Sequence, residues 1–248
     1  MPSSFADRRA VVAGLFAFLA APATAAQNHP PLFDVVWSTR LTLDQRTALE
    51  SWTKDLEALA QGWWPVITTA LASPGFTPAS RITLDISAIS PKTIPAMTNG
   101  TRITVDAGYV LSQIRNPDRS GMVAHEMVHV AQAYPPGAPP FLTEGIADYL
   151  RYYVLLPNDI NRGFDPRGRG PWAGYQSTAA LLDWIERQHP GAVQATNADL
   201  RDGGDGFGPL KRFGGGDITR LWRAYLATSP PAATPEAEQA AIRALSPR

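Results

Sequence analysis

The sequence contains no cysteine at any of its 248 positions. Disulfide bonds, metal sites built on thiolates and cysteine nucleophiles are therefore excluded together. A metal ion bound by this chain must be held by nitrogen and oxygen atoms. Histidine is also scarce, with four residues in the whole chain, so any cluster of histidines is informative.

Net charge is absent as well. Lysine plus arginine and aspartate plus glutamate each number 22, so composition predicts neither a nucleic-acid partner nor an anionic membrane surface. The length suits one ordinary domain with a sizeable core, and no internal repeat is visible. We expect a monomer.

The N-terminus has the three parts of a signal peptide. These are a positively charged region, an apolar region and a small-residue cleavage site: Arg8–Arg9, Ala10–Ala20 and Ala23–Ala25. A membrane anchor is the alternative, but the apolar run is well short of the roughly 20 residues that a bilayer span needs. We expect residues 1–25 to be removed during export, by the general or the twin-arginine route, leaving a domain over residues 26–248. The richness in Ala, Pro and Arg suggests a bacterial source, so the compartment is the periplasm or the medium, without membrane contact.

Hydrophobic periodicity and turn residues predict strands followed mainly by helices. Two strands are expected around an Asn-Gly turn at Asn99–Gly100: Arg81–Ser87 and Arg102–Asp106. Outside the central motif region, helices are expected at Thr42–Leu59, Trp172–Gln188, Asp217–Thr228 and Pro235–Leu245. Connectors are expected at Asn158–Pro171 and Gly203–Gly216. The first helix begins with a capping box, Thr42 to Gln45. Gly62 and Pro65 are expected to break or kink it.

The central motif is H-E-x-x-H, formed by His125, Glu126 and His129. A helix is predicted over about Arg119–Tyr134, and its apolar residues wrap most of its circumference, so it is expected to be buried. Helical spacing places the two histidines one turn apart, where they can bind one metal ion, with Glu126 beside it to accept a proton from water. A chance match is improbable, about one in a hundred, because the motif holds half of the histidines in the chain.

A catalytic zinc site generally uses a third protein ligand, which must lie outside the motif. Metzincins need Gly at position 132 and His at position 135, but this chain has Gln132 and Pro135, so that class is excluded. The segment Pro135–Pro140 is expected to end the first helix and reverse the chain. Thr143 is expected to cap a second helix, Glu144–Leu156.

Glu144 and Asp148 are four residues apart on this second helix, hence on one face. Their spacing downstream of H-E-x-x-H resembles that of gluzincins, in which the glutamate is the third metal ligand. We therefore interpret Glu144 as a ligand, and Asp148 as the carboxylate that accepts a hydrogen bond from a ligand histidine and orients it. The alternatives are an acidic residue favoured by the helix N-terminus for Glu144 and a surface charge for Asp148.

Two segments together resemble a known family. H-E-M-V-H-V-A-Q at 125–132, followed by T-E-G-I-A-D-Y-L-R at 143–151, is similar to the basic secretory protein family of plants and bacteria, gluzincin-type peptidases. The likeness extends over roughly Arg81–Thr228. It implies an α+β, zincin-like single domain with a small, mostly antiparallel sheet packed on the active-site helix and a largely helical C-terminal half. The word basic does not apply to this neutral chain.

The resemblance implies zinc-assisted hydrolysis of a peptide or protein substrate. The metal ligands would be His125, His129 and Glu144. Glu126 would accept a proton from the attacking water and pass it to the leaving amine. Tyr175 is the candidate donor to the developing oxyanion, with a core tyrosine as the alternative role. Its competitors are Tyr149, Tyr152 and Tyr153.

Further roles and rival functions stay open at this point. Arg102–Asp106 is a candidate edge strand that pairs with an extended substrate, and Gln132 either faces the cleft or caps its helix. A zinc-dependent amidase or aminopeptidase would use the same site. A non-catalytic binding protein with a structural zinc would need a fourth protein ligand, for which His29 and His189 are candidates. The intact Glu126 favours an enzyme.

Overall fold

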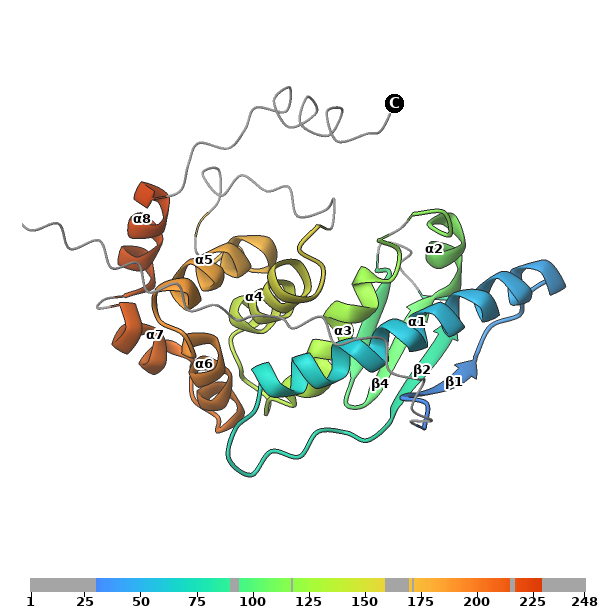
Figure 1. The fold of residues 1–248 in the computed structure, drawn as a ribbon, viewed down its shortest axis with the longest axis horizontal. Helices are drawn as coiled ribbons and strands as arrows, with labels where there is room; N and C mark the ends of the chain where they lie inside the picture. Colours follow the sequence, from blue (N-terminus) through green and yellow to red (C-terminus); the bar gives the residue numbers. More distant parts are fainter. Residues whose placement is uncertain are drawn as a thin grey trace, which may run out of the picture. The chain divides into compact units, whose positions relative to one another are not determined.

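Four strands form one sheet in the computed structural model, in the order β1-β2-β4-β3, and Figure 1 labels β1, β2 and β4. Their bounds are Phe33–Trp37 (β1), Ile82–Ser87 (β2), Ala96–Asn99 (β3) and Arg102–Asp106 (β4). The structure describes residues 30–89, 94–116, 118–158, 170, 172–214 and 217–228. The expected signal peptide, the helix expected at Pro235–Leu245 and nearly all of the segment Asn158–Pro171 lie outside these residues.

Two of the three strand pairings are parallel, so the prediction of a mostly antiparallel sheet is wrong. β1 pairs with β2 and β2 with β4 in parallel, while β3 is antiparallel to β4. The predicted Asn-Gly turn joins β3 and β4 in a hairpin, with Asn99 opposite Arg102, but the strand before the turn is Ala96–Asn99, which was not predicted, in place of Arg81–Ser87. β1 and β2 are parallel because a long helix connects them, and such a crossover returns the chain in the same direction. The predicted edge strand β4 is therefore interior, and β3 is the edge.

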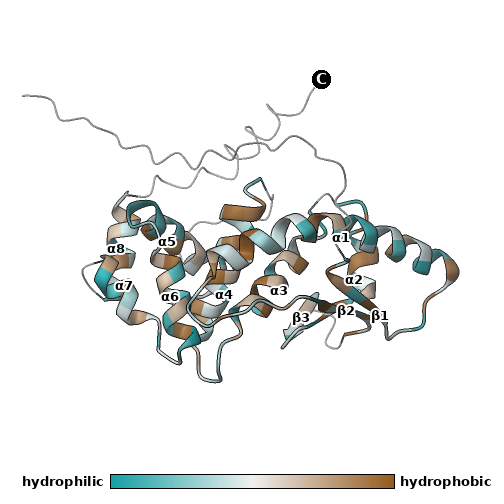
Figure 2. Cartoon of the chain, turned by 60° about the horizontal axis from the view of Figure 1, so that its bottom comes forward, coloured by the Kyte–Doolittle hydropathy of each residue, from teal (hydrophilic) through white to brown (hydrophobic). Residues whose placement is uncertain are grey.

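The connecting helix, Leu43–Ala70 (α1), continues through Gly62 and Pro65, where a break or kink was predicted. Thr42 and Gln45 form the expected capping box. Pro65 is exposed, and a proline in a helix interior costs about 3 kcal/mol of stability. Hydrophobic and hydrophilic residues alternate along α1 (Figure 2). The side of the helix opposite Pro65 buries a stripe that continues past the proline: Leu49, Trp52, Leu56, Ala60, Trp63 and Ile67. Each large side chain in it contributes about 1.5–3 kcal/mol on burial, so the stripe outweighs the proline.

The helix Gly121–Gln132 (α3) carries the histidine motif and is buried along its whole length except at His129. It packs against α1, β3 and β4. The indole N–H of Trp52 on α1 donates to Ser120 Oγ, just before α3, over 3.1 Å. The expected burial of the motif helix is confirmed, and it places the motif residues in the interior beside the sheet edge.

Helix α3 ends at Gln132, before Tyr134, where the predicted helix Arg119–Tyr134 ends. Ala133 takes a left-handed conformation with φ 45° and ends the helix. The guanidinium of Arg201 then satisfies the last carbonyl groups, donating to Ala131 O over 2.7 Å and to Gln132 O over 3.1 Å. A cation at this end also favours the helix dipole.

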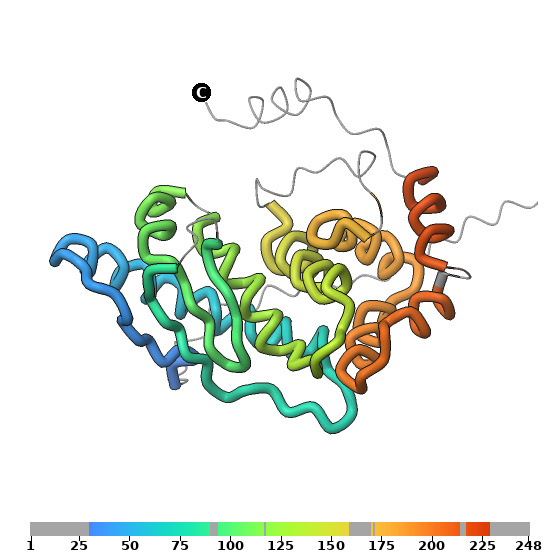
Figure 3. The backbone as a smooth tube through the Cα atoms, turned by 180° about the vertical axis from the view of Figure 1, so that it is seen from behind, coloured from blue at the N-terminus to red at the C-terminus, as the bar shows by residue number. Residues whose placement is uncertain are grey.

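The second half of the chain is helical, as expected (Figure 3). Its elements are Pro140–Tyr149 (α4), the π-helix Leu150–Leu155 (η1), Tyr175–Gln188 (α5), Ala192–Arg201 (α6), Phe207–Gly214 (α7) and Ile218–Thr228 (α8), while the short helix Ala107–Ser112 (α2) precedes α3. The prediction for α8 is confirmed, and Asp217 caps it by accepting from the N–H of Arg220. The connector predicted at Gly203–Gly216 is wrong, because Leu210 packs into the core and holds α7 in place. α2 and α6 were not predicted.

The α+β class with a small sheet and mostly helical content is confirmed. Kinship with the zincin fold stays a prediction. Within the described part of the chain, no helix combines the length and the apolar character needed to cross a bilayer.

Candidate metal centre

Helices α3 and α4 place four predicted site residues side by side. His125 and His129 lie one turn apart on α3, and Glu144 and Asp148 one turn apart on α4. The Nε2 atoms of the two histidines are 3.1 Å apart. Glu144 Oε2 lies 3.1 Å from His125 Nε2 and 3.5 Å from His129 Nε2. In the part of the chain that the structure describes, these two histidines and Glu144 form a group that could hold a metal ion. We call these three residues the metal group.

The donor atoms of this group suit a divalent cation. His125 Nδ1 is 2.8 Å from Asp148 Oδ1, and His129 Nδ1 is 2.7 Å from Gln132 Oε1. Both oxygens accept hydrogen bonds, so in the neutral imidazoles each Nδ1 carries the hydrogen and each Nε2 presents a lone pair. Two lone pairs and a carboxylate then face one another, an arrangement that a cation relieves. Their separations of 3.1–3.5 Å resemble the edges of about 3.3 Å of a zinc tetrahedron with bonds of about 2.0–2.1 Å.

The same contacts change the protonation of the group. Burial favours neutral imidazole, but the hydrogen bonds with Asp148 and Glu144 outweigh it and raise the pKa of His125 to about 9. Burial also opposes ionisation of Glu144, yet its hydrogen bonds with the two histidines lower its pKa to about 2. A proton and a metal ion therefore compete for the same place between these atoms.

The start of α4 directs Glu144 toward the histidines. The helix begins at Pro140 after Pro139, since proline suits the first turn of a helix. Thr143 is therefore not the N-cap that was predicted. It lies in the first turn, and its hydroxyl donates to Pro139 O over 3.2 Å. The earlier start places Glu144 inside the helix with a fixed direction.

Gly145 fixes the distance between α4 and α5. A Cβ atom at Gly145 would lie 2.4 Å from Cγ2 of the fully buried Thr178 on α5, which is closer than any real contact. A side chain at this position would push α5 away and displace the neighbouring Glu144. The absence of a side chain at Gly145 thus has a packing reason.

Glu126 is buried, and Thr98 at the sheet edge holds its carboxylate. Thr98 Oγ1 donates to Glu126 Oε2 over 2.7 Å and lies 3.1 Å from the backbone oxygen of the same residue. Sequence reasoning missed Thr98. The signal was available, because the hairpin pairs Thr98 with the core residue Ile103, and strand alternation puts the two on the same face of the sheet.

Tyr175 is the first residue of α5, and its ring lies against the metal group. The ring stacks on the imidazole of His125 with centroids 6.2 Å apart and planes 12° from parallel. Its φ of 45° is rare for a residue with a side chain, and Gly174 before it also has a positive φ, 68°. A Cβ at Gly174 would lie 3.5 Å from Phe141 Cα. The two positive φ values turn the chain so that the ring faces His125.

The hydroxyl of Tyr175 is a proton donor at neutral pH. Burial, and then the negative charges of Glu144 and Asp148, raise its pKa above the ordinary value. The competing tyrosines have other contacts. Tyr149 and Tyr153 stack on each other, and Tyr152 lies under the guanidinium of Arg151.

Residues 57–225 match the family model described as a peptidase of plants and bacteria. The chain belongs to this family. The match covers well over half of the chain, from within α1 to within α8, and includes both helices of the metal group. The resemblance to the basic secretory protein family is thereby confirmed. Neither the curated proteins nor the solved structures contain a match to the chain.

As one of the peptidases of plants and bacteria, the protein acts on peptides or proteins. Its metal group lies in a cavity of about 740 Å³. Edge strand β3 forms one wall through Ala96, Met97 and Thr98, and the π-helix contributes Arg151 and Tyr152. The cavity is of the size that binds small molecules or short peptide segments. It brings together the residues predicted for metal binding and for catalysis, including Glu126 and Tyr175.

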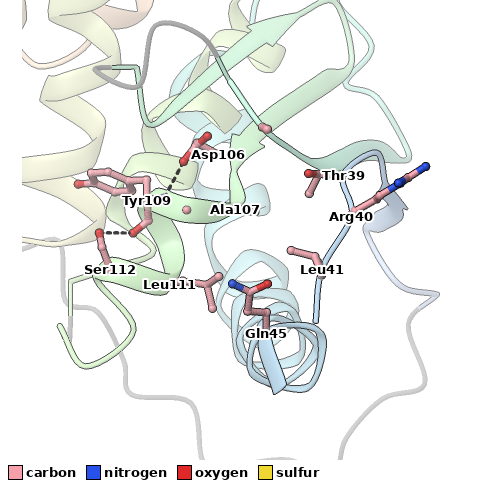
Figure 4. Close-up of a pocket in the computed structure, with 11 residues that line it drawn as sticks. Thr39, Arg40, Leu41, Gln45, Asp106, Ala107, Tyr109, Leu111 and Ser112 are labelled. Atoms are coloured by element: carbon pink, nitrogen blue, oxygen red, sulfur yellow. Dashed lines mark hydrogen bonds between the residues drawn. The ribbon is translucent and has the colours of Figure 1, made fainter. Parts of the chain in front are cut away.

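A second cavity of this peptidase, of about 460 Å³, lies at the carboxyl ends of the parallel strands (Figure 4). Its buried carboxylate, Asp106, already accepts from the backbone N–H groups of Tyr109 and Ile89, over 2.6 and 2.8 Å. Gln45 is engaged with the N–H of Thr42. The side chains of Asp106 and Gln45 in this cavity thus serve the local fold.

The candidate fourth ligands do not join the metal group in the part of the peptidase that the structure describes. His189 lies at the end of α5, with its ring 6.0 Å from that of Phe213, and it is not among the clustered ligands. His29 lies outside the described residues. Among the described residues, His125, His129 and Glu144 are the clustered candidate ligands, and a metal ion held by these three alone would keep a coordination position open, which is typical of catalytic metal sites.

Proposed function

We propose that the protein is an exported zinc-dependent endopeptidase of the gluzincin type. The observation that carries the proposal is the group of His125, His129 and Glu144, whose donor atoms face one another in one cavity with Glu126. The family adds the reaction class. Zinc suits two imidazole nitrogens and one carboxylate oxygen, and the fourth position is left for the reaction.

Zinc in this group would supply a Lewis acid that lowers the pKa of water and polarises the scissile carbonyl. Glu126 accepts the proton of the attacking water and donates it to the leaving amine. Asp148 accepts the Nδ1 hydrogen of His125, which keeps the Nε2 atom directed at the metal position. Thr98 holds the carboxylate of Glu126 in place.

Tyr175 is proposed as the donor that stabilises the developing oxyanion. Its ring is parallel to that of His125, and its hydroxyl keeps the proton at neutral pH. The side chain is 54% exposed, so a substrate in the cavity can reach it. The strained backbone at Tyr175 supports a functional reason for this position.

The substrate is proposed to pair with β3, in place of the strand Arg102–Asp106 that the sequence suggested. β3 is the edge of the sheet and lines the cavity. An extended peptide that adds to this edge passes Thr98 and therefore comes close to Glu126. The sheet edge thus both binds the peptide and orients the proton acceptor.

A digest of a peptide library by the purified protein in the presence of zinc tests the proposed reaction. Internal cuts are expected. Removal of single N-terminal residues alone would indicate the aminopeptidase, cleavage of non-peptide amides alone the amidase, and zinc binding without cleavage the binding protein. Export is tested on the protein recovered from the periplasm or medium, which is expected to begin at Ala26.

Replacing Thr98 by valine is expected to lower kcat about tenfold and to leave zinc affinity unchanged. The change removes one hydrogen bond to a charged group, worth about 1.5–3 kcal/mol, and tenfold in rate corresponds to about 1.4 kcal/mol. Thr104→Val on β4 is the matched control, because Thr104 pairs with Met97 and therefore faces away from α3. A Thr98→Val enzyme with the kcat of the control would remove Thr98 from the mechanism.

A further inference from the structure

Gln132 connects the two helices of the metal group through its side chain. It is the last residue of α3 and is 2% exposed. Its Oε1 lies 2.7 Å from His129 Nδ1, and its Nε2 donates to Thr143 O on α4 over 2.8 Å. Thr143 immediately precedes the ligand Glu144. One buried amide therefore contacts a metal ligand of one helix and the backbone beside a ligand of the other.

The orientation of the Gln132 side-chain amide is determined by the carbonyl group of Thr143. Thr143 O can only accept, so the NH₂ group of Gln132 must face it. The amide oxygen then faces His129, and Nδ1 of that imidazole must carry the hydrogen. The lone pair of His129 is thereby placed on Nε2, which points at His125 and Glu144.

Capping of α3 does not explain the buried amide of Gln132. The carbonyl groups of His129, Ala131 and Gln132 at this end have other donors. The N–H of Ala133 donates to His129 O over 3.4 Å, and Arg201 donates to Ala131 O and Gln132 O. The side chain also does not face the cleft, because it is buried between the helices. Neither role suggested by the sequence fits.

We propose that Gln132 is the positioning residue of His129, fixing its tautomer and direction and tying it to the segment that carries Glu144. The two histidine ligands then have different partners, the carboxylate of Asp148 for His125 and a neutral amide for His129. Through Thr143 O the amide also sets the separation between ligands on different helices. The proposal rests on the proposed function only in that the group binds zinc.

The test is the zinc affinity of purified variants, measured by competition with a chelator. Gln132→Met has nearly the shape of glutamine but neither accepts from His129 nor donates to Thr143, and it is expected to bind zinc about 10- to 100-fold more weakly. Gln132→Glu restores the acceptor for His129 and is expected to bind zinc more tightly than Gln132→Met. Gln188→Met is the matched control, because Gln188 also donates to a backbone carbonyl, that of Trp184, but lies exposed at the end of α5.

Thermal unfolding of the metal-free variants separates positioning from packing. A role in joining the helices alone would lower the melting temperature of Gln132→Met without changing zinc affinity, and that result would overturn the proposal. Equal zinc affinities for the Met and Glu variants would overturn it as well. The measured quantity is zinc affinity, so this test does not depend on peptide cleavage. A wild-type protein that binds zinc but cleaves no peptide refutes the endopeptidase, and the role of Gln132 can still be tested. A wild-type protein without zinc affinity overturns both the endopeptidase and the role of Gln132.

Discussion

Replacement of Glu126 by glutamine is expected to lower kcat for peptide hydrolysis by about 10²- to 10⁴-fold, the range that general acid–base catalysis supplies. Glutamine keeps the size of the side chain and can still accept a hydrogen bond from Thr98, but it cannot take a proton from water. Zinc content is expected to stay unchanged, because Glu126 is not one of the three clustered ligands. The loss should therefore appear in turnover and not in metal binding.

The measurement is kcat on a peptide found in the library digest, together with zinc content by elemental analysis. Glu50→Gln is the matched control, since Glu50 is an exposed residue of α1 paired with Arg46, and its kcat should equal that of wild type. Undiminished cleavage by Glu126→Gln would show that another group accepts the proton.

Removal of zinc is expected to abolish hydrolysis and to lower the thermal stability of the protein. Without a cation, a proton takes its place between His125, His129 and Glu144, because the pKa of His125 is raised to about 9, and zinc must displace this proton when it binds. A ligand at 100 times its Kd stabilises the folded state by about 2.7 kcal/mol, so the melting temperature should rise with zinc concentration. Dialysis against a chelator followed by addition of one equivalent of zinc should remove and then restore both properties.

Two histidine variants control this experiment. His129→Ala is expected to lose bound zinc and activity together, whereas His189→Ala is expected to keep both, because the ring of His189 lies beside Phe213 and outside the metal group. Full hydrolysis by a preparation without metal would contradict the site. Loss of zinc in His189→Ala would favour the rival with a closed, structural site.

The sequence predicted the metal group because its signals are local. Two histidines one helical turn apart, a Pro-rich reversal and two carboxylates one turn apart on the next helix are enough to bring four side chains together. The structure places His125 and Asp148 in the expected contact. Errors within this region were confined to helix ends, such as the predicted cap at Thr143, since proline at the start of α4 competes with the threonine for the first position.

Features that depend on distant parts of the chain were predicted poorly. The parallel direction of β1 and β2 follows from the path of α1 between them, which neither strand segment encodes by itself. A break or kink was predicted at Pro65, because helix propensity does not include the buried stripe of α1, which keeps the helix continuous. The approach of Tyr175 to His125 depends on positive φ values at Gly174 and Tyr175. The sequence indicates only the one at Gly174, because glycine adopts positive φ readily and tyrosine does not.

The proposed metal ligands and Asp148 all lie in one continuous stretch of chain, His125–Asp148, whereas Thr98 and Tyr175 come from before and after it. In a folding chain, contacts between residues near in sequence cost less loop entropy than contacts between distant ones. The contact between α3 and α4 therefore costs little loop entropy, while the contacts of the sheet edge and of α5 with these helices close longer loops and cost more. In the proposed active site, the geometry for binding a metal ion comes from contacts that are local in the sequence, and the geometry for cutting a peptide requires the complete fold.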